Sequence, residues 1–215
     1  GNQVQSDSVT FDLGFYTEQC RHNDGETDLV AYYPFEGSAD DVSGNGYDGS
    51  ITNQGTYVGG RSGQAVSFDG TEGYVNVADA DGLDSFSSLT VSAWFRLDGG
   101  GAGPANTLVR KNGAYLLQRT SGDYISFAVW DGGLADWKAV RTRVFDASDY
   151  GTWHHVSGVF DSDESTYTLY LDGVEVDTAT TTATTVASSS SPLTVGGLED
   201  QYSLDGALDD VRIYS

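Results

Sequence analysis

One segment near the middle of the chain reads Leu89-Thr90-Val91-Ser92-Ala93-Trp94-Phe95-Arg96-Leu97. Every second residue from Leu89 to Leu97 is apolar, and three of the four residues between them are polar. Side chains of a β-strand alternate between its two faces, so this period of two predicts a strand with one face in a core. A helix would instead repeat its apolar residues every three or four positions.

The same alternation recurs on both sides of this segment. The other predicted strands are Ala65–Phe68, Tyr74–Val77, Tyr115–Gln118, Tyr124–Trp130, His154–Phe160, Tyr167–Leu171 and Asp209–Tyr214. Glycine-containing turns such as 68–70, 98–101 and 171–174 separate them, and glycine readily adopts the positive φ of tight turns. Short strands at roughly ten-residue spacing predict an all-β fold, a two-sheet antiparallel sandwich.

The net charge of the chain excludes some classes of binding partner. The chain of 215 residues has 10 Lys+Arg against 32 Asp+Glu, a formal net charge of -22. This charge repels phosphate backbones and anionic lipid headgroups, so we expect neither nucleic acid nor a membrane surface as a partner. No apolar run approaches the roughly 18 residues of a membrane-spanning helix.

The acidic residues have an unusual composition: 25 Asp and 7 Glu stand beside only two lysines, Lys111 and Lys138. At about 1 M salt the Debye length is only ~3 Å, which screens repulsion between carboxylates. The composition therefore predicts a protein of a halophilic microbe, archaeal in origin, that loses cooperative folding when salt is removed. An ordinary acidic secreted protein is the alternative.

Seven fragments follow one another in a recognisable order: Leu29–Gly37, Asp41–Gly46, Gly63–Gly70, Leu89–Trp94, Trp153–Val156, Leu169–Gly173 and Leu204–Tyr214. With this series, residues 29–215 resemble a laminin-G-like jelly roll of the concanavalin A-like lectin/glucanase superfamily. The resemblance implies one jelly-roll domain over 29–215, preceded by an extension over 1–28. It does not fix the function, since the superfamily includes lectins, adhesion modules, structural domains and glycosidases.

Catalysis is not expected. The glucanases of this superfamily carry a Glu-x-Asp-x-x-Glu strand motif, in which two carboxylates act on the glycosidic bond. The nearest match here is Glu175-Val176-Asp177, which is followed by Thr180 where the second Glu is required.

Calcium is the expected cofactor. The resemblance implies a structural Ca²⁺ where the first and last strands meet, with a carboxylate from Asp209 or Asp210 and main-chain oxygens near Phe35 or Gly70. These are the hard oxygen ligands that calcium prefers. Alternatively, these aspartates cap turns or bind hydrated Na⁺ or K⁺.

Two further motifs contain metal-ligating residue types. His154 and His155 are adjacent on a predicted strand, so they point to opposite faces and cannot bind one metal from the same side. Cys20 is the sole cysteine and cannot form an intrachain disulfide.

A segment with two tryptophans is the best candidate for glycan binding. It reads Trp130-Asp131-Gly132-Gly133-Leu134-Ala135-Asp136-Trp137. Exposed tryptophans with nearby carboxylates suit a sugar platform, so Trp130, Asp131, Asp136 and Trp137 are the predicted ligand-binding residues. The alternative is that the two tryptophans only pack at the rim of the core.

The extension contains a predicted strand over residues 8–16, with Val9, Phe11, Leu13 and Phe15 on one face. This strand either covers an edge of its own sandwich or adds to the sheet of a neighbouring subunit. Head-to-tail addition would generate an open filament.

Taken together, these patterns predict a non-catalytic extracellular or cell-surface protein in adhesion or surface assembly, with copies of itself or a surface glycan as partner. A carbohydrate-binding, lectin-like module is the alternative, and a glycosidase is a distant third.

Overall fold

The computed structural model describes residues 29–99, 105–120, 124–131, 136–143, 148–198 and 202–215. The predicted assembly strand, with Val9, Phe11, Leu13 and Phe15, lies outside these residues. The described strands are β1 Leu29–Tyr33, β2 Gly49–Asn53, β3 Thr56–Gly59, β4 Gln64–Asp69, β5 Gly73–Val77, β6 Ser88–Leu97, β7 Ala105–Lys111, β8 Tyr115–Thr120, β9 Tyr124–Asp131, β10 Asp136–Arg143, β11 Trp153–Asp161, β12 Thr166–Leu171, β13 Val174–Thr180, β14 Leu193–Val195 and β15 Asp205–Tyr214, and a short 3-10 helix spans Asp81–Leu83.

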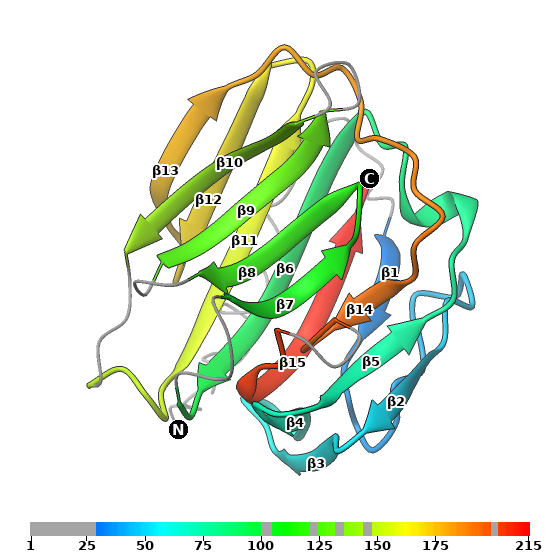
Figure 1. Cartoon of the computed structure of the whole chain (residues 1–215), viewed down its shortest axis with the longest axis vertical. Coiled ribbons are helices and arrows are strands. Elements are labelled where there is room, and N and C mark those ends of the chain that lie inside the picture. Colours follow the sequence, from blue (N-terminus) through cyan, green and yellow to red (C-terminus); the bar gives the residue numbers. More distant parts are fainter. Residues whose placement is uncertain (1–28, 100–104, 121–123, 132–135, 144–147, 199–201) are drawn as a thin grey trace, which may run out of the picture.

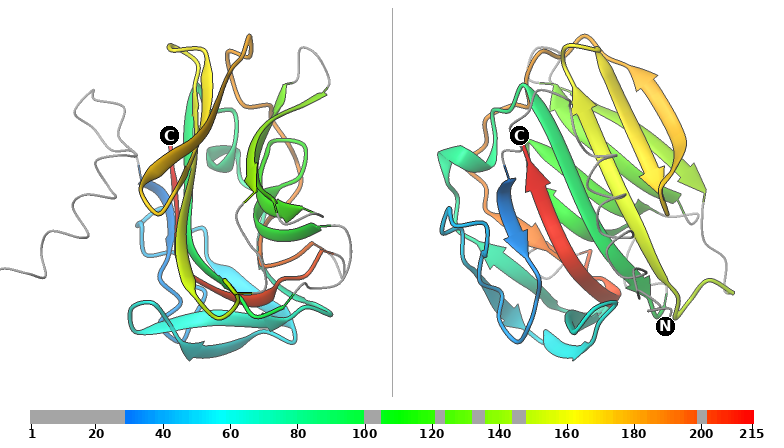
Figure 2. Two further views of the ribbon diagram at one scale, coloured as in Figure 1. Left: turned by 90° about the vertical axis from the view of Figure 1, so that its left-hand side faces the viewer. Right: turned by 180° about the vertical axis from the view of Figure 1, so that it is seen from behind.

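The strands form two antiparallel sheets that pack face to face (Figures 1 and 2). One sheet has eight strands in the order β13-β12-β11-β6-β15-β4-β3, with β1 paired to β15. The other has seven strands in the order β10-β9-β8-β7-β14-β5-β2 and faces the viewer in Figure 1. The predicted all-β, two-sheet antiparallel sandwich is confirmed. No helix in the described segments is long and apolar enough to cross a membrane.

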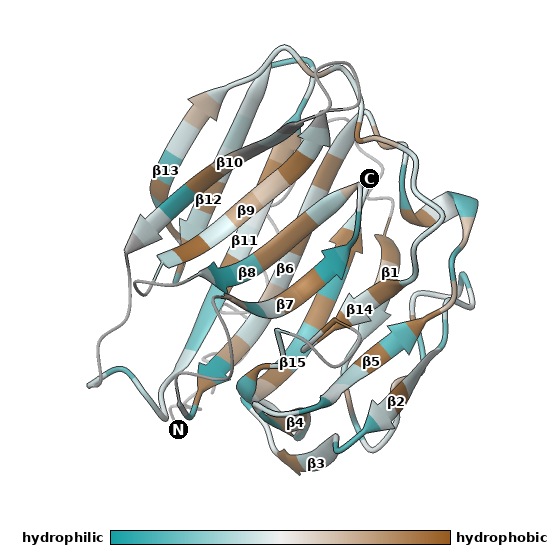
Figure 3. Ribbon diagram, in the orientation of Figure 1, coloured by the Kyte–Doolittle hydropathy of each residue, from teal (hydrophilic) through white to brown (hydrophobic). Residues whose placement is uncertain are grey.

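The core lies between the sheets and follows the alternation in the sequence. The apolar residues of β6, from Leu89 to Leu97, are buried in it, and those of β9 pack from the opposite sheet. Figure 3 shows apolar and polar residues alternating along these strands. The sheets touch closely at Gly158, where a Cβ atom would lie 2.2 Å from Cγ of Phe127. Only glycine leaves room for that ring.

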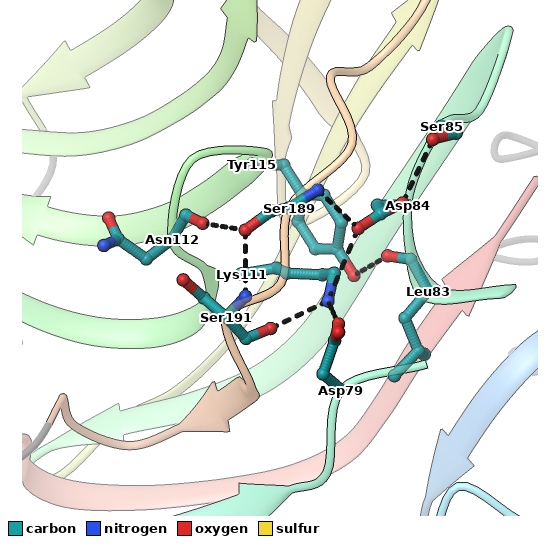
Figure 4. A network of polar contacts seen from close by, with 9 residues as sticks. All are labelled: Asp79, Leu83, Asp84, Ser85, Lys111, Asn112, Tyr115, Ser189 and Ser191. Atoms are coloured by element: carbon teal, nitrogen blue, oxygen red, sulfur yellow. Dashed lines mark hydrogen bonds and ion pairs between the residues drawn. The ribbon is translucent and has the colours of Figure 1, made fainter. Parts of the chain in front are cut away.

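A buried lysine fastens the long connection between β13 and β14 to the sandwich (Figure 4). The Lys111 side chain is fully buried, and its Nζ lies 2.5 Å from Asp79 Oδ1 and 3.5 Å from Asp84 Oδ2. It also donates to the carbonyl oxygen of Ser191 at 2.8 Å, and Asp84 in turn accepts from the Ser189 amide at 2.8 Å. The ammonium therefore joins β7, the loop before β6 and the connection after β13.

The outer edge of β1 is closed by the loop that follows it. The amide of Tyr32 donates to Asp41 Oδ1 at 3.0 Å, and the carbonyl of Tyr32 accepts from the Val42 amide at 2.9 Å. The carbonyl of Val30 accepts from Asn45 Nδ2 at 2.9 Å. Backbone groups that another strand would need are thus already bonded.

Candidate functional site

The two tryptophans of the predicted glycan site form a cross-strand pair on β9 and β10. Trp130 lies opposite Trp137, with ring centroids 5.4 Å apart and an edge-to-face angle of 71°. The Trp130 amide donates to the Ala114 carbonyl at 2.7 Å, on the side away from β10. The two residues are therefore a non-hydrogen-bonded pair, the arrangement that brings cross-strand side chains closest. Both side chains remain partly exposed.

The two aspartates of the same prediction pair through their backbones. Asp131 lies opposite Asp136 in the register of β9 and β10. Their side chains are outside what the structure describes, so their part in a site stays a prediction.

Further residues of β9 lie on the same outer face as the two tryptophans. Ile125, Phe127 and Val129 of β9 are in the core, so the alternate residues Tyr124, Ser126, Ala128 and Trp130 face outward. The small residues lie between the aromatic ones. At about 3.4 Å per residue, the six-residue step from Tyr124 to Trp130 spans roughly 20 Å.

An arginine stacks on the far aromatic residue of this strip. Arg141 of β10 is exposed, and its guanidinium lies 5.2 Å from the centre of the Tyr124 ring. A cation over an aromatic face contributes about 0.5–1 kcal/mol at an exposed site. This contact also limits the positions that the long side chain samples.

Polar side chains of β7 and β8 lie on the same outer face, nearer the middle of the sheet. Gln118 of β8 lies opposite Ser126 of β9, and Arg110 of β7 lies opposite Leu116 of β8. Arg110 Nη2 donates to Asn112 Oδ1 at 2.8 Å. Burial lowers the pKa of the Arg110 guanidinium. We call Arg110, Gln118, Tyr124, Trp130, Trp137 and Arg141 the aromatic face.

The aromatic face differs in charge from the rest of the molecule. At the outward positions of the seven-stranded sheet whose side chains the structure describes, there is no Asp or Glu. The outer side of the eight-stranded sheet, in contrast, carries Asp209, Asp210 and Glu175. The chain has 32 acidic residues, yet none of the described side chains on the outer face of the seven-stranded sheet is a carboxylate.

The two aspartates of the predicted calcium site lie on the opposite sheet, in β15. Asp209 is buried, and its Oδ2 accepts from the amides of Arg61 at 2.8 Å and Ser62 at 3.1 Å. Burial raises the pKa of Asp209 to about 6. A Cβ atom at Gly60 would lie 2.6 Å from the same oxygen, so glycine allows this turn to approach the carboxylate.

Asp210 has other partners. Its Oδ1 accepts from the Tyr32 hydroxyl at 2.5 Å and from Arg212 Nη2 at 3.0 Å. Phe35 and Gly70 both have positive φ, at 56° and 78°. Donors, including a cationic guanidinium, already occupy the carboxylate oxygens named here, so calcium would have to displace them or bind the remaining Asp209 oxygen. Among the described residues, no three acidic, His or Cys side chains are grouped as a metal site requires. The calcium site remains a prediction.

The two histidines point to opposite faces of β11, as their alternation predicts. His154 Nδ1 lies 2.7 Å from Asp172 Oδ2, and its ring packs 6.0 Å from that of Phe95 on the core side. His155 is buried on the outer side, with its ring 5.2 Å from that of Trp94. Burial lowers the pKa of His155 to about 4.

Sequence reasoning missed Arg110, Gln118, Tyr124 and Arg141 as members of one surface. They come from four different strands and share no motif. The one available signal was the tryptophan pair: once Trp130 is placed opposite Trp137, the register also brings Ser126 opposite Arg141.

Comparison with known proteins identifies a family and several similar structures. A family model described as "Concanavalin A-like lectin/glucanases superfamily" matches residues 69–215. Domain 4 of AbnA, an extracellular arabinanase from Geobacillus stearothermophilus solved in complex with arabinotriose, is similar in structure, with a TM-score of 0.70 and 21% identity over 88% of this chain and 93% of that one.

Longer binding domains are similar as well. The binding domain of Paraclostridial Mosquitocidal Protein 1 has a TM-score of 0.68 and 19% identity, over 87% of this chain and 48% of that one. A structure of botulinum neurotoxin type C, whose cell entry depends on interaction with two ganglioside molecules, gives 0.63 and 16%, over 87% and 47%. The chain thus spans about half the length of these two. Such low identities show the fold alone. No curated protein matches by sequence.

Proposed function

The chain belongs to the concanavalin A-like lectin/glucanases superfamily, and from this membership we propose that it is an extracellular carbohydrate-binding module that holds a glycan on its aromatic face. The observation that carries the proposal is the outward-facing, partly exposed pair Trp130 and Trp137, which lies at one end of the strip from Tyr124 to Trp130. We place this alternative from the sequence analysis before adhesion by self-assembly, because one similar structure was solved with arabinotriose and another similar protein interacts with gangliosides.

The chemistry of the aromatic face suits a sugar chain. A pyranose or furanose ring has an apolar face that packs on tryptophan and a rim of hydroxyl groups that need hydrogen-bond partners. Trp130, Trp137 and Tyr124 supply aromatic surfaces at both ends of the strip. Gln118 and the arginines supply fixed amide and guanidinium groups between and beside them.

The neighbours in structure support the same class of ligand. The arabinanase domain was solved with arabinotriose, and the neurotoxin interacts with gangliosides. The arabinanase is extracellular, which agrees with the proposed location.

Binding without cleavage follows from the residues of the face. Most glycosidases act through two carboxyl groups that flank the scissile bond. The outward positions with described side chains on the seven-stranded sheet include no such group. With the side chains of Asp131 and Asp136 outside the described residues, we propose binding without hydrolysis from the described part of the face.

The proposal is tested by measuring glycan binding on an array and then by titration, for the full chain and for Trp137→Ala. We expect the variant to bind at least about tenfold more weakly, as expected when an aromatic anchor is lost. Trp153→Ala is the matched control, because Trp153 is also a partly exposed strand tryptophan with an arginine, Arg96, 5.3 Å above it, but on the opposite sheet. Unchanged binding by the double variant Trp130→Ala and Trp137→Ala would overturn the site.

A further inference from the structure

We infer that the glycan held on the aromatic face is anionic, and that Arg110 and Arg141 contact its carboxylate or sulfate groups. This inference rests on the proposed function, since it names the class of sugar that the same face binds.

The first argument is the distribution of charge. The chain carries -22 overall, yet the described outward side chains of the seven-stranded sheet include two arginines and no acid. A face that bound only neutral sugars would not need this separation, because hydroxyl groups accept and donate equally well beside carboxylates. An anionic sugar does need it, since a nearby carboxylate would repel it.

The second argument is the state of Arg141. In the part of the chain that the structure describes, Arg141 has no ion pair, and its guanidinium is held over Tyr124. On the opposite sheet Arg61 is also stacked on a ring, that of Trp94, but Arg96 and Arg212 are in ion pairs. Arg96 binds Asp98 through two contacts of 2.7 Å, and Arg212 lies 3.0 Å from Asp210. Among the described residues, the nearest carboxylate in contact with Arg141 is that of Asp177, which accepts from its backbone amide at 2.9 Å, so the guanidinium itself is oriented and not engaged in an ion pair.

The third argument is the state of Arg110. It is partly buried and donates to the neutral amide of Asn112, and its Nε is buried with no hydrogen-bond partner among the described residues. A desolvated charge without a counter-ion is costly to the folded protein. The carboxylate or sulfate of a bound sugar would provide a counter-ion and acceptors that the described residues do not supply.

Guanidinium groups suit these anions particularly well. Arginine binds carboxylates and sulfate-like groups through two parallel hydrogen bonds, which add direction to the charge attraction. Such contacts act at hydrogen-bond distance, within the Debye length of ~3 Å that remains at about 1 M salt. The interaction would thus persist where the long-range repulsion from the rest of the chain is screened.

The test uses two pairs of polymers that differ only in charge. Binding of the full chain to polygalacturonate is compared with binding to its fully methyl-esterified form. Binding to dextran sulfate is compared with binding to dextran, and all four polymers are measured in the same buffer with about 1 M KCl. We expect an anionic member to bind at least about tenfold more tightly than its neutral counterpart, as for hydrogen bonds to charged groups. The pair that shows the difference identifies carboxylate or sulfate as the anion.

Arginine variants locate the effect. Arg141→Gln, at an exposed residue, and Arg110→Gln should each reduce the preference for the anionic polymer by about tenfold or more. Arg61→Gln is the matched control, since Arg61 also stacks on an aromatic ring, 4.7 Å from the centre of Trp94, but on the opposite sheet. A preference that survives in both aromatic-face variants would overturn the assignment.

The remaining outcomes separate this inference from the proposed function. Equal or tighter binding of the neutral polymers, or array hits confined to neutral glycans, would overturn the anionic ligand and leave the carbohydrate-binding function standing. Failure to bind any polymer or array glycan would overturn both.

Discussion

Asp209 and His155 lie opposite the same residue, Trp94, on the two strands that flank β6. Both side chains are buried, with 1% and 6% of their surface exposed. Burial raises the pKa of the aspartate to about 6 and lowers that of the histidine to about 4. In each case the neutral form is favoured by removal from water. The two groups therefore oppose each other in the dependence of stability on pH.

The folded protein binds the proton of Asp209 more tightly than the unfolded chain does, because the pKa of this carboxyl group is 3.8 in the unfolded chain. Its contribution to stability is greatest below that value and falls as the pH rises to about 6, by up to about 3 kcal/mol. Asp209→Asn removes the titration and keeps an oxygen for the Arg61 and Ser62 amides. We expect its unfolding free energy relative to wild type to rise by about 2–3 kcal/mol between about pH 4 and pH 7. Denaturant unfolding measures the unfolding free energy of both proteins as a function of pH. Parallel curves for wild type and Asp209→Asn would contradict this prediction.

The same variant bears on the predicted calcium site. A bound cation favours the deprotonated carboxylate and would lower the pKa of Asp209. If calcium binds there, adding it should flatten the difference between wild type and Asp209→Asn. Profiles that calcium leaves unmoved would argue against the site.

For His155 the sign is reversed. The unfolded imidazole has a pKa of 6.5 and binds the proton more tightly than the folded one. Its contribution is fully present above that value and is lost as the pH falls towards 4, by up to about 3 kcal/mol. His155→Gln should be less stable than wild type at neutral pH, through lost packing on Trp94, and the gap should narrow as the pH falls. His154→Gln is the control, and a gap that widens on acidification would disprove the account.

The Lys111 cluster predicts a large loss of stability. Lys111→Met would leave the Asp84 carboxylate, whose side chain is 4% exposed, without its cation. Removing one partner of a buried ion pair costs about 3–5 kcal/mol. Denaturant unfolding measures the loss, and adding Asp84→Asn should restore part of it by removing the unpaired charge. A loss below about 1 kcal/mol in the single variant would show that Lys111 is not needed as a counter-ion.

The acidic composition predicts that stability depends on salt. Removing salt restores repulsion among the carboxylates, so the midpoint of thermal unfolding should fall steeply below about 1 M KCl. Circular dichroism across a KCl series measures it, with sucrose as a control for solvent exclusion. An unchanged midpoint between low and molar salt would remove the case for a halophilic protein.

Strands were predictable where apolar and polar residues alternate over several positions. β6 and β9 alternate because every second residue packs between the sheets. β1 and β14 are short and β7 contains an irregularity in its register, so these three were missed although their residues are buried in the core. Exposed strands were missed for another reason. In β10, whose sequence begins with Asp136 and ends with Arg143, Val140 is the core residue, so no apolar period is visible. β13 is similarly exposed along most of its length. Edge strands form through backbone pairing, which sequence periodicity does not record.

The residues of the candidate site were also predictable only in part. Trp130 and Trp137 were predictable because one short segment contains both. Arg110 and Arg141 were not, because they are far apart in sequence and come to lie on one face, three strands apart, only through the register of β7 to β10. Calcium was predicted from resemblance, and the hydrogen bonds that occupy Asp209 and Asp210 depend on Arg61, Tyr32 and Arg212, which no local pattern links to them.

Strand donation by residues 8–16 needs an accepting edge, and the structure narrows the choice. The edge of β1 is bonded to its own loop through Asp41 and Val42. At β10 the Arg141 amide donates to Oδ2 of Asp177 on β13 at 2.9 Å, a contact that uses a backbone group of β10 but only a side chain of β13. β13 ends its sheet in the described chain and is exposed, with Val174 at 62%. Of these three edges, β13 is the one we expect to accept a donated strand.

This expectation is tested by negative-stain electron microscopy in molar salt. The full chain should form filaments, and a variant lacking residues 1–27 should not, because the donated backbone is gone. Val174→Lys places a charge at the accepting edge without disturbing the core and should also suppress assembly. Filaments from the truncated chain would disprove donation, filaments from Val174→Lys would exclude β13 as the acceptor, and dispersed particles from the full chain would assign the N-terminal strand to its own sandwich.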